Sequence, residues 1–165
     1  MSGSLLIKNR QRTIPLNTRL LRTLTASLLK ELLKIEQFDL AIHIVRAPEM
    51  ARLNEQFLQH SGSTDVITFD YSEDSKLKTQ KPKPALQGEI FICIDDAIAQ
   101  AREFRTSWQS EIARYVIHGI LHLRGFDDIR AADRRKMKRE ENRLLKEVGR
   151  LFPLRKLASG PRLTS

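Results

Sequence analysis

The sequence predicts an α+β fold in which helices pack a small mixed β-sheet within one domain. Strand-like and helix-like segments are mixed along the 165 residues, and they do not follow a strict strand–helix–strand alternation. The sequence contains no internal repeat, and its length suits one domain with a substantial core. Hydrophobic residues make up 41% of the chain, which is usual for a globular protein.

Four segments have the composition and spacing of β-strands. They cover residues 5–8, 38–45, 64–71 and 88–94. In the second segment apolar side chains fill both alternating sets of positions, which predicts a strand covered on both faces. We therefore expect His43 to be a structural residue of the sheet. Cys93 lies in the apolar run 90–94, and we expect it to be a small buried side chain.

Helical spacing and capping residues predict five helices. They cover about 18–35, 48–57, 96–104, 107–123 and 130–148. The expected caps are Asn17 or Thr18 for the first helix, Asp95 and Asp96 for the third, and a capping box of Thr106 and Gln109 for the fourth.

The chain is expected to divide into a domain over residues 1–150 and a flexible C-terminal tail over 151–165. Gly149 and Pro153 are the residues that should end the last helix. Residues 72–86 are polar and contain four lysines, so they predict either a mobile flap or a solvated loop without function.

Composition bears on location and on partners. The chain carries a formal net charge of +9, and the part from residue 129 onward has 12 Lys and Arg against 4 Asp and Glu. Such an excess favours a polyanionic partner, above all nucleic acid, although solubility alone is an alternative. With one cysteine, no apolar run long enough to span a membrane and no signal-peptide pattern at its start, the chain is expected to be cytoplasmic, without a membrane partner.

The stretch 115–128 carries the clearest chemical signal. His118 and His122 are four residues apart on a predicted helix, so both imidazoles leave the same face. Two nitrogen ligands so placed can reach one Zn²⁺ ion at about 2.0–2.1 Å. Gly125 breaks the helix three residues later, and the freed backbone can fold a carboxylate back as third ligand. Asp128 is the expected ligand, and Asp127 is its rival.

The spacing of this stretch is that of the metzincin proteases, with two differences. Position 119 is Gly, where a protease carries the Glu that acts as general base. Position 128 is Asp, where the protease pattern has a third His. Two histidines four apart also occur by chance on helix surfaces, but the apolar helix end, the helix-stopping Gly125 and the following carboxylate favour a metal site.

At these residues the chain resembles the YbeY family, whose signature reads His-Gly-x-Leu-His-Leu-x-Gly-aromatic-Asp-His. The match runs from His118 to Asp127 and departs at Asp128. Further similar stretches extend the resemblance over roughly residues 5–149; they are Leu53-Asn54, residues 63–69, residues 88–90, Gln100-Ala101, Met137, Glu140 or Glu141, and Leu144-Leu145. Family members often carry an Arg, thought to help catalysis, where Leu58 stands, a Pro at Ser63 and a His at Arg114.

The resemblance implies one Zn²⁺ per chain and a single-strand-specific endoribonuclease that acts on the 16S rRNA 3′ end, in ribosomal RNA maturation and ribosome quality control. Its implied partners are single-stranded RNA, ribosomal RNA and the ribosomal small subunit. His118, His122 and Asp128 would act through the metal. Leu58 is uncharged, so the positive charge that the Arg of family members supplies would here come from His60, Arg114 or a loop lysine.

Several other residues are candidates with competing structural explanations. Thr64, Asp65 and Arg124 are candidate substrate-binding groups, and Asp65 is also a candidate for orienting a ligand histidine. A strand-start role for Asp65 and a solvated helix end for Arg124 are the alternatives. Asp127 is expected either to hold the loop that delivers Asp128 or to cap the helix end locally. The cations at 134, 135, 136, 138 and 139 would either follow an RNA backbone or form a solvated helix face.

The expected chemistry is metal-assisted phosphodiester cleavage. Three protein ligands leave a position for water, whose pKa zinc can lower to about 7. Either that water or the ribose 2′-hydroxyl can serve as nucleophile. The two alternatives to the nuclease are a non-catalytic RNA- or ribosome-binding factor stabilised by metal, and a zinc metalloprotease-like hydrolase.

Overall fold

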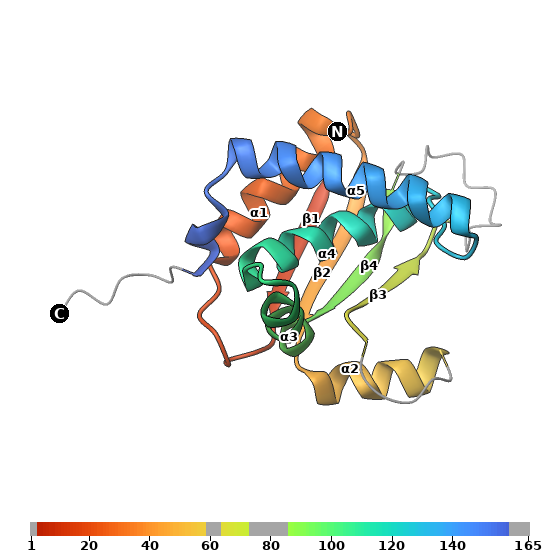
Figure 1. Ribbon diagram of the computed structural model, residues 1–165. Coiled ribbons are helices and arrows are strands. Elements are labelled where there is room, and N and C mark those ends of the chain that lie inside the picture. The colour runs from red at the N-terminus through yellow and green to blue at the C-terminus, as the bar shows by residue number, and fades with distance from the viewer. Residues whose placement is uncertain (1–2, 59–63, 73–85, 159–165) are drawn as a thin grey trace.

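The computed structural model describes residues 3–58, 64–72 and 86–158 (Figure 1). A four-stranded sheet has the order β1-β2-β4-β3, with β1 at Ser4–Asn9, β2 at Phe38–Val45, β4 at Leu86–Cys93 and β3 at Val66–Asp70. The first three strands in this order are parallel, and β3 runs antiparallel to β4. The mixed sheet and its helices confirm the predicted α+β class.

Two helices, α1 (Thr18–Ser27) and α4 (Trp108–Leu123), pack on one face of the sheet, and α5 (Ala131–Leu151) packs against α4 on the same side (Figure 1). Alternate residues of β2, among them Leu40 and Ile42, point into the main core on this side. On the other face α2 (Ala47–Leu53) covers a smaller apolar cluster of Val45, Met50, Ile67, Phe91 and Cys93. The strand β2 is therefore covered on both faces toward its C-terminal end, as predicted.

His43 and Cys93 are buried in the sheet region, as the sequence predicts for structural residues. Cys93 is completely buried in the smaller cluster. The His43 ring stacks on Phe91 with centroids 4.3 Å apart, and its Nε2 lies 2.6 Å from a carboxylate oxygen of Glu89. Within the described ranges, none of the helices is both long and apolar enough to cross a membrane.

Two predicted helix starts are displaced. The N-cap of α3 (Ile94–Phe104) is Cys93, and Asp95 lies inside the first turn, where it accepts a hydrogen bond from the Ala47 N–H at 2.7 Å. The N-cap of α4 is Ser107, whose hydroxyl accepts from the Ser110 N–H at 3.1 Å. The predicted capping box at Thr106 was therefore wrong by one residue.

The C-terminal segment also differs from the prediction. Gly149 does not end α5, which continues to Leu151. A 3₁₀-helix follows at Leu154–Ala158, and its Leu157 is fully buried in the main core. The carbonyl of Leu157 accepts a hydrogen bond from the Asn17 N–H at 2.8 Å, so this segment closes the start of α1. The expected flexible tail thus does not hold for residues 154–158, and 159–165 lie outside the described residues.

Gly119 lets α4 approach β4 closely. A Cβ atom at this position would lie 2.7 Å from Ile90 Cδ1 and 2.8 Å from Ile90 Cγ2, which is inside van der Waals contact. Position 119 therefore faces the sheet, whereas His118 and His122 leave the helix on another side. The close approach fixes the depth at which α4 holds the two histidines above the sheet.

We expect Gly119→Ala to destabilise the protein. Overpacking costs about 1–3 kcal/mol, which outweighs the gain of about 0.5–1 kcal/mol from replacing a helical glycine. Gly149→Ala is the matched control, because a Cβ there would meet only Leu154 Cδ1, at 3.9 Å, and this change should stabilise by about 0.5–1 kcal/mol. Urea unfolding measures both, and a stabilised Gly119→Ala variant would contradict the close contact.

Candidate metal centre

The end of α4 is built by a left-handed turn at Gly125, whose φ is +98°. The Gly125 N–H donates to the His122 carbonyl and the Phe126 N–H donates to the Leu121 carbonyl, both at 3.0 Å. This is a Schellman motif, and its positive φ favours glycine. The turn reverses the chain immediately after His122, so the following residues run back toward the histidines.

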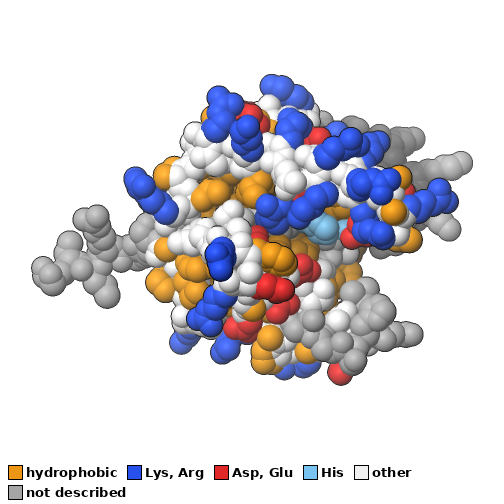
Figure 2. Space-filling model, in the orientation of Figure 1, with side chains coloured by type: hydrophobic (Ala, Val, Ile, Leu, Met, Phe, Trp, Pro, Cys, Tyr) orange, Lys and Arg blue, Asp and Glu red, His pale blue; other side chains and the backbone are white. Residues whose placement is uncertain are grey.

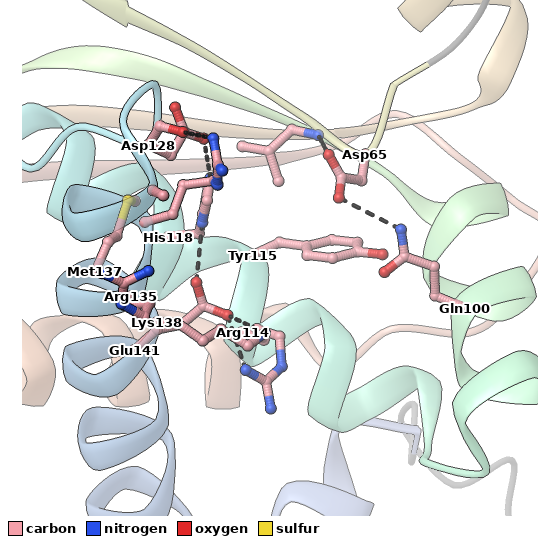
Figure 3. Close-up of a pocket in the computed structure, with 13 residues that line it drawn as sticks. Asp65, Gln100, Arg114, Tyr115, His118, Asp128, Arg135, Met137, Lys138 and Glu141 are labelled. Atoms are coloured by element: carbon pink, nitrogen blue, oxygen red, sulfur yellow. Dashed lines mark hydrogen bonds and ion pairs between the residues drawn. The ribbon is translucent and has the colours of Figure 1, made fainter.

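Two contacts hold the returning loop. The Asp127 side chain accepts a hydrogen bond from the Ile129 N–H at 2.9 Å, in agreement with its expected loop-holding role. Arg134, from α5, donates to the Ile129 carbonyl at 2.8 Å. Asp128 lies between these anchors, half-exposed, and Figure 3 shows it beside His118.

Three potential ligand atoms converge at this point. His118 Nε2 and His122 Nε2 are 3.1 Å apart. Asp128 Oδ2 lies 3.6 Å from His122 Nε2 and 4.0 Å from His118 Nε2. A point equidistant from atoms so separated is about 2.1 Å from each, which is a usual zinc–nitrogen or zinc–oxygen distance. His118, His122 and Asp128 could therefore hold one metal ion.

The hydrogen bonds behind the histidines strengthen this conclusion. His122 Nδ1 lies 3.1 Å from the Phe126 carbonyl, and His118 Nδ1 lies 2.9 Å from a Glu141 carboxylate oxygen. Both partners are acceptors, so each Nδ1 is assigned as the protonated nitrogen and each Nε2 carries a lone pair. Two such Nε2 atoms 3.1 Å apart beside a carboxylate are favourably placed around a cation, and a metal ion would bind all three groups.

Glu141 orients His118 although it lies 23 residues further along the chain, on α5. Its side chain is almost completely buried and also accepts from Arg114 at 2.8 Å. Burial alone would raise the pKa of Glu141, but the hydrogen bonds from His118 and Arg114 and the charge of Lys138 hold this pKa below its ordinary value. Glu141 is therefore ionised at neutral pH, the state in which it accepts the His118 proton.

A cavity of about 500 Å³ opens beside His118, between α4, α5 and the start of β3 (Figure 3). One wall is formed by α5 and carries cationic side chains, and the facing wall contains Asp65, Gln100 and Tyr115. Burial and the charges of Asp65 and Glu111 raise the pKa of Tyr115 well above its usual range, so its hydroxyl stays protonated. Among the described residues this hydroxyl has no hydrogen-bond partner. The cavity thus combines a candidate metal group with polar and cationic walls.

The remaining candidate site residues lie in different parts of the structure. His60 lies outside the described residues. Arg114 lines the cavity, but its guanidinium is bound to Glu141 and to the Asn142 side chain, each at 2.8 Å. Arg124 lines a different hollow, together with Lys136.

Asp65 and Thr64 lie together across the cavity from α5. The side chain of Asp65 accepts from the Val66 N–H at 2.8 Å and from Gln100 at 3.4 Å, and neither histidine is among its partners. The interpretation that Asp65 orients a ligand histidine was therefore wrong, because Glu141 and the Phe126 carbonyl do so. Thr64 lies beside Asp65, with its hydroxyl 3.5 Å from Asp65 Oδ1. Substrate contact by Asp65, Thr64 or Arg124 stays a prediction.

Sequence reasoning predicted Glu141 as a site residue only in part, and it did not predict Tyr115. Glu141 was one of two glutamates noted on the closing helix, without a role, because only the α4–α5 packing shows which of them reaches His118. Tyr115 is one turn before His118, and a helical spacing of three is the signal that could have placed it on the same side.

Fold and site together define a mixed α+β domain with a two-histidine, one-carboxylate group at a helix end. Residues 6–149 match the family model described as Endoribonuclease YbeY. The chain therefore belongs to the YbeY family. The resemblance seen in the sequence is confirmed over most of its length.

Individual relatives agree with this assignment. An Endoribonuclease YbeY from Finegoldia magna is 32% identical over 146 residues, which cover 87% of this chain and 92% of the relative. Those from Salinibacter ruber and Parabacteroides distasonis are 37% and 39% identical over 97 residues, covering 59% of this chain and only 62% of each relative. The solution structure of TM1509 from Thermotoga maritima has a TM-score of 0.62 and 28% identity, covering 96% of this chain and 99% of that one.

We expect Glu141→Gln to weaken zinc binding by about 10–100-fold, because the amide cannot hold the His118 proton as the carboxylate does. Glu140→Gln is the matched control: Glu140 is the neighbouring residue on α5, pairs with Arg143 at the surface and does not contact His118. Competition with a chromophoric chelator measures both affinities. Equal losses in the two variants would show that the His118–Glu141 contact has no specific effect on the metal.

Proposed function

We propose that this protein is a zinc-dependent, single-strand-specific endoribonuclease that acts in ribosomal RNA maturation, at the 16S 3′ end, and in ribosome quality control. The observation that carries the proposal is the convergence of His118, His122 and Asp128 at the edge of a cavity with a cationic wall. Membership of a family whose relatives are described as endoribonucleases supports the reaction class.

In this proposal the side chains hold and orient the reacting groups. His118, His122 and Asp128 bind the ion, while Glu141 and the Phe126 carbonyl fix the two imidazoles. When bound, a Zn²⁺ ion supplies a Lewis acid for a phosphate oxygen and lowers the pKa of water. The aspartate makes the ligand set one charge more negative than three neutral histidines would, which moderates that Lewis acidity.

The contact between Gly119 and Ile90 argues against the protease alternative. A metzincin-type protease needs a general-base Glu between its first two histidines. Position 119 is pressed against the sheet, with no space even for a Cβ. The general-base route of those enzymes is therefore not available to this chain.

The proposed substrate and setting follow from charge and family. Single-stranded RNA is a polyanion with flexible, unpaired nucleotides, and it suits an open cavity with arginine and lysine on one side. The ribosomal small subunit is the proposed partner, and the cytoplasm is the proposed place of action.

Cleavage of RNA should depend on the metal. Protein incubated with single-stranded RNA covering a 16S 3′ end should cut it, a chelator should stop cleavage, and added Zn²⁺ should restore it. The same sequence annealed into a duplex is the control and should stay intact. Fragments separated on a denaturing gel give the readout.

The non-catalytic alternative gives a different result in the same assay. A metal-stabilised RNA-binding factor would bind the oligonucleotide and contain zinc, but it would leave the RNA intact at every metal concentration. That outcome, with zinc content near one per chain, would replace the nuclease by the binding factor.

Substitutions at Asp128 test its role as a ligand. Asp128→Ala should lower zinc affinity strongly because two histidines from one helix leave the site incomplete, whereas Asp128→His should retain binding. Asp127→Ala is the matched neighbour and should act mainly through the loop, since Asp127 accepts the Ile129 N–H. Zinc content by elemental analysis and affinity by chelator competition measure each variant. Unchanged affinity in Asp128→Ala, with a loss in Asp127→Ala, would transfer the ligand role to Asp127.

A further inference from the structure

The basic run on α5 divides between two surfaces. Arg134, Arg135 and Lys138 line the cavity that contains His118 and Asp128. Lys136 is on another side, with its Nζ 5.9 Å from the centre of the Phe126 ring. Arg139 is exposed and is absent from the described lining of that cavity. The sequence run is therefore not one uniform basic face, and only part of it borders the candidate metal centre.

The cationic side chains that line the cavity differ in the hydrogen bonds and ion pairs that they form. Arg114 is held by Glu141 and Asn142, and Arg134 donates to loop carbonyls at 2.8 and 3.4 Å. Lys138 lies 3.5 Å from Glu141 Oε1. Arg135 forms no hydrogen bond or ion pair with any residue that the structure describes, and it is exposed. Among the described residues that line the cavity, Arg135 is thus the cation that is paired with no carboxylate or carbonyl.

The charge around the cavity is unevenly distributed. Figure 2 shows Lys and Arg side chains gathered along α5 beside the histidine, with Asp and Glu side chains on the opposite side. The cavity wall that faces α5 contains Asp65. A polyanion is attracted to the first side and repelled by the second. A nucleic-acid strand that enters the cavity therefore has one favourable wall for its phosphates.

We propose that Arg135 binds a phosphate of the RNA next to the metal-binding group, so that the strand passes along the α5 wall. This inference rests on the proposed function, since it identifies how the substrate of that reaction is held. The guanidinium presents a planar fork of donors that matches two phosphate oxygens. The cavity volume of about 500 Å³ lies within the range of sites that hold small-molecule ligands, so a nucleotide fits beside the contact.

The test measures binding separately from cleavage. A fluorescent single-stranded RNA is titrated in the presence of chelator, which prevents cutting, and the affinity is followed from 50 to 200 mM salt. Loss of one phosphate contact should reduce the slope of log K against log salt by about 0.7. We expect Arg135→Ala to show this smaller slope and an affinity about tenfold lower. Arg135→Lys should keep the slope and lose part of the affinity, because it retains the charge without the fork.

Arg139→Ala is the matched control, because it removes an identical charge one turn away on the same helix, outside the cavity lining. Its slope and affinity should remain near those of the unaltered protein. In cleavage assays with Zn²⁺, Arg135→Ala should raise KM more than it lowers kcat. All variants should unfold at the same urea concentration, since neither arginine forms a hydrogen bond or ion pair with another described residue.

The outcomes separate the two proposals. An unchanged slope in Arg135→Ala, or equal effects of Arg135→Ala and Arg139→Ala, overturns the specific contact and leaves the nuclease proposal intact. A reduced slope in Arg135→Ala alone, in a protein that cuts no RNA with any amount of Zn²⁺, supports the phosphate contact and rejects the nuclease activity.

Discussion

Three potential ligand groups, His118, His122 and Asp128, are directed at one point, and this convergence constrains the rest of the structure. The Nε2 atoms of His118 and His122 face one another at 3.1 Å beside the Asp128 carboxylate, an arrangement that a bound cation would stabilise. Keeping the three groups together needs a helix of the right depth, a turn that sends the chain back and a second helix behind the first. Gly119, Gly125 and Glu141 meet these three requirements in that order.

The site is consequently distributed between rigid and adaptable parts. The two histidines are on α4, which packs on β3 and β4 and on α5. Asp128 is on a half-exposed loop that is fixed by an Asx turn and by Arg134. A ligand set of this kind holds two donors firmly in place and lets the third adjust its distance to the ion.

The sequence predicted those features that depend on local spacing. The strands of the sheet follow from their apolar patterns, and the four-residue separation of His118 and His122 placed both rings on one helix face. Asp128 was predicted from its offset behind Gly125 and from the family signature. The α4 cap was misplaced because Thr106 and Ser107 are both good capping residues and only the observed backbone distinguishes them. The role of Glu141 could not be assigned, since it depends on how two helices pack across 23 residues, and position 65 offered an equally plausible carboxylate.

The 3₁₀-helix at Leu154–Ala158 has a consequence for how the chain completes its fold. Its Leu157 fills the main core, and its carbonyl receives the Asn17 N–H at the beginning of α1. The family model matches residues 6–149, whereas the residues packed in the main core extend to Leu157. During synthesis the core therefore stays open on the α1 side until residue 157 has left the ribosomal exit tunnel.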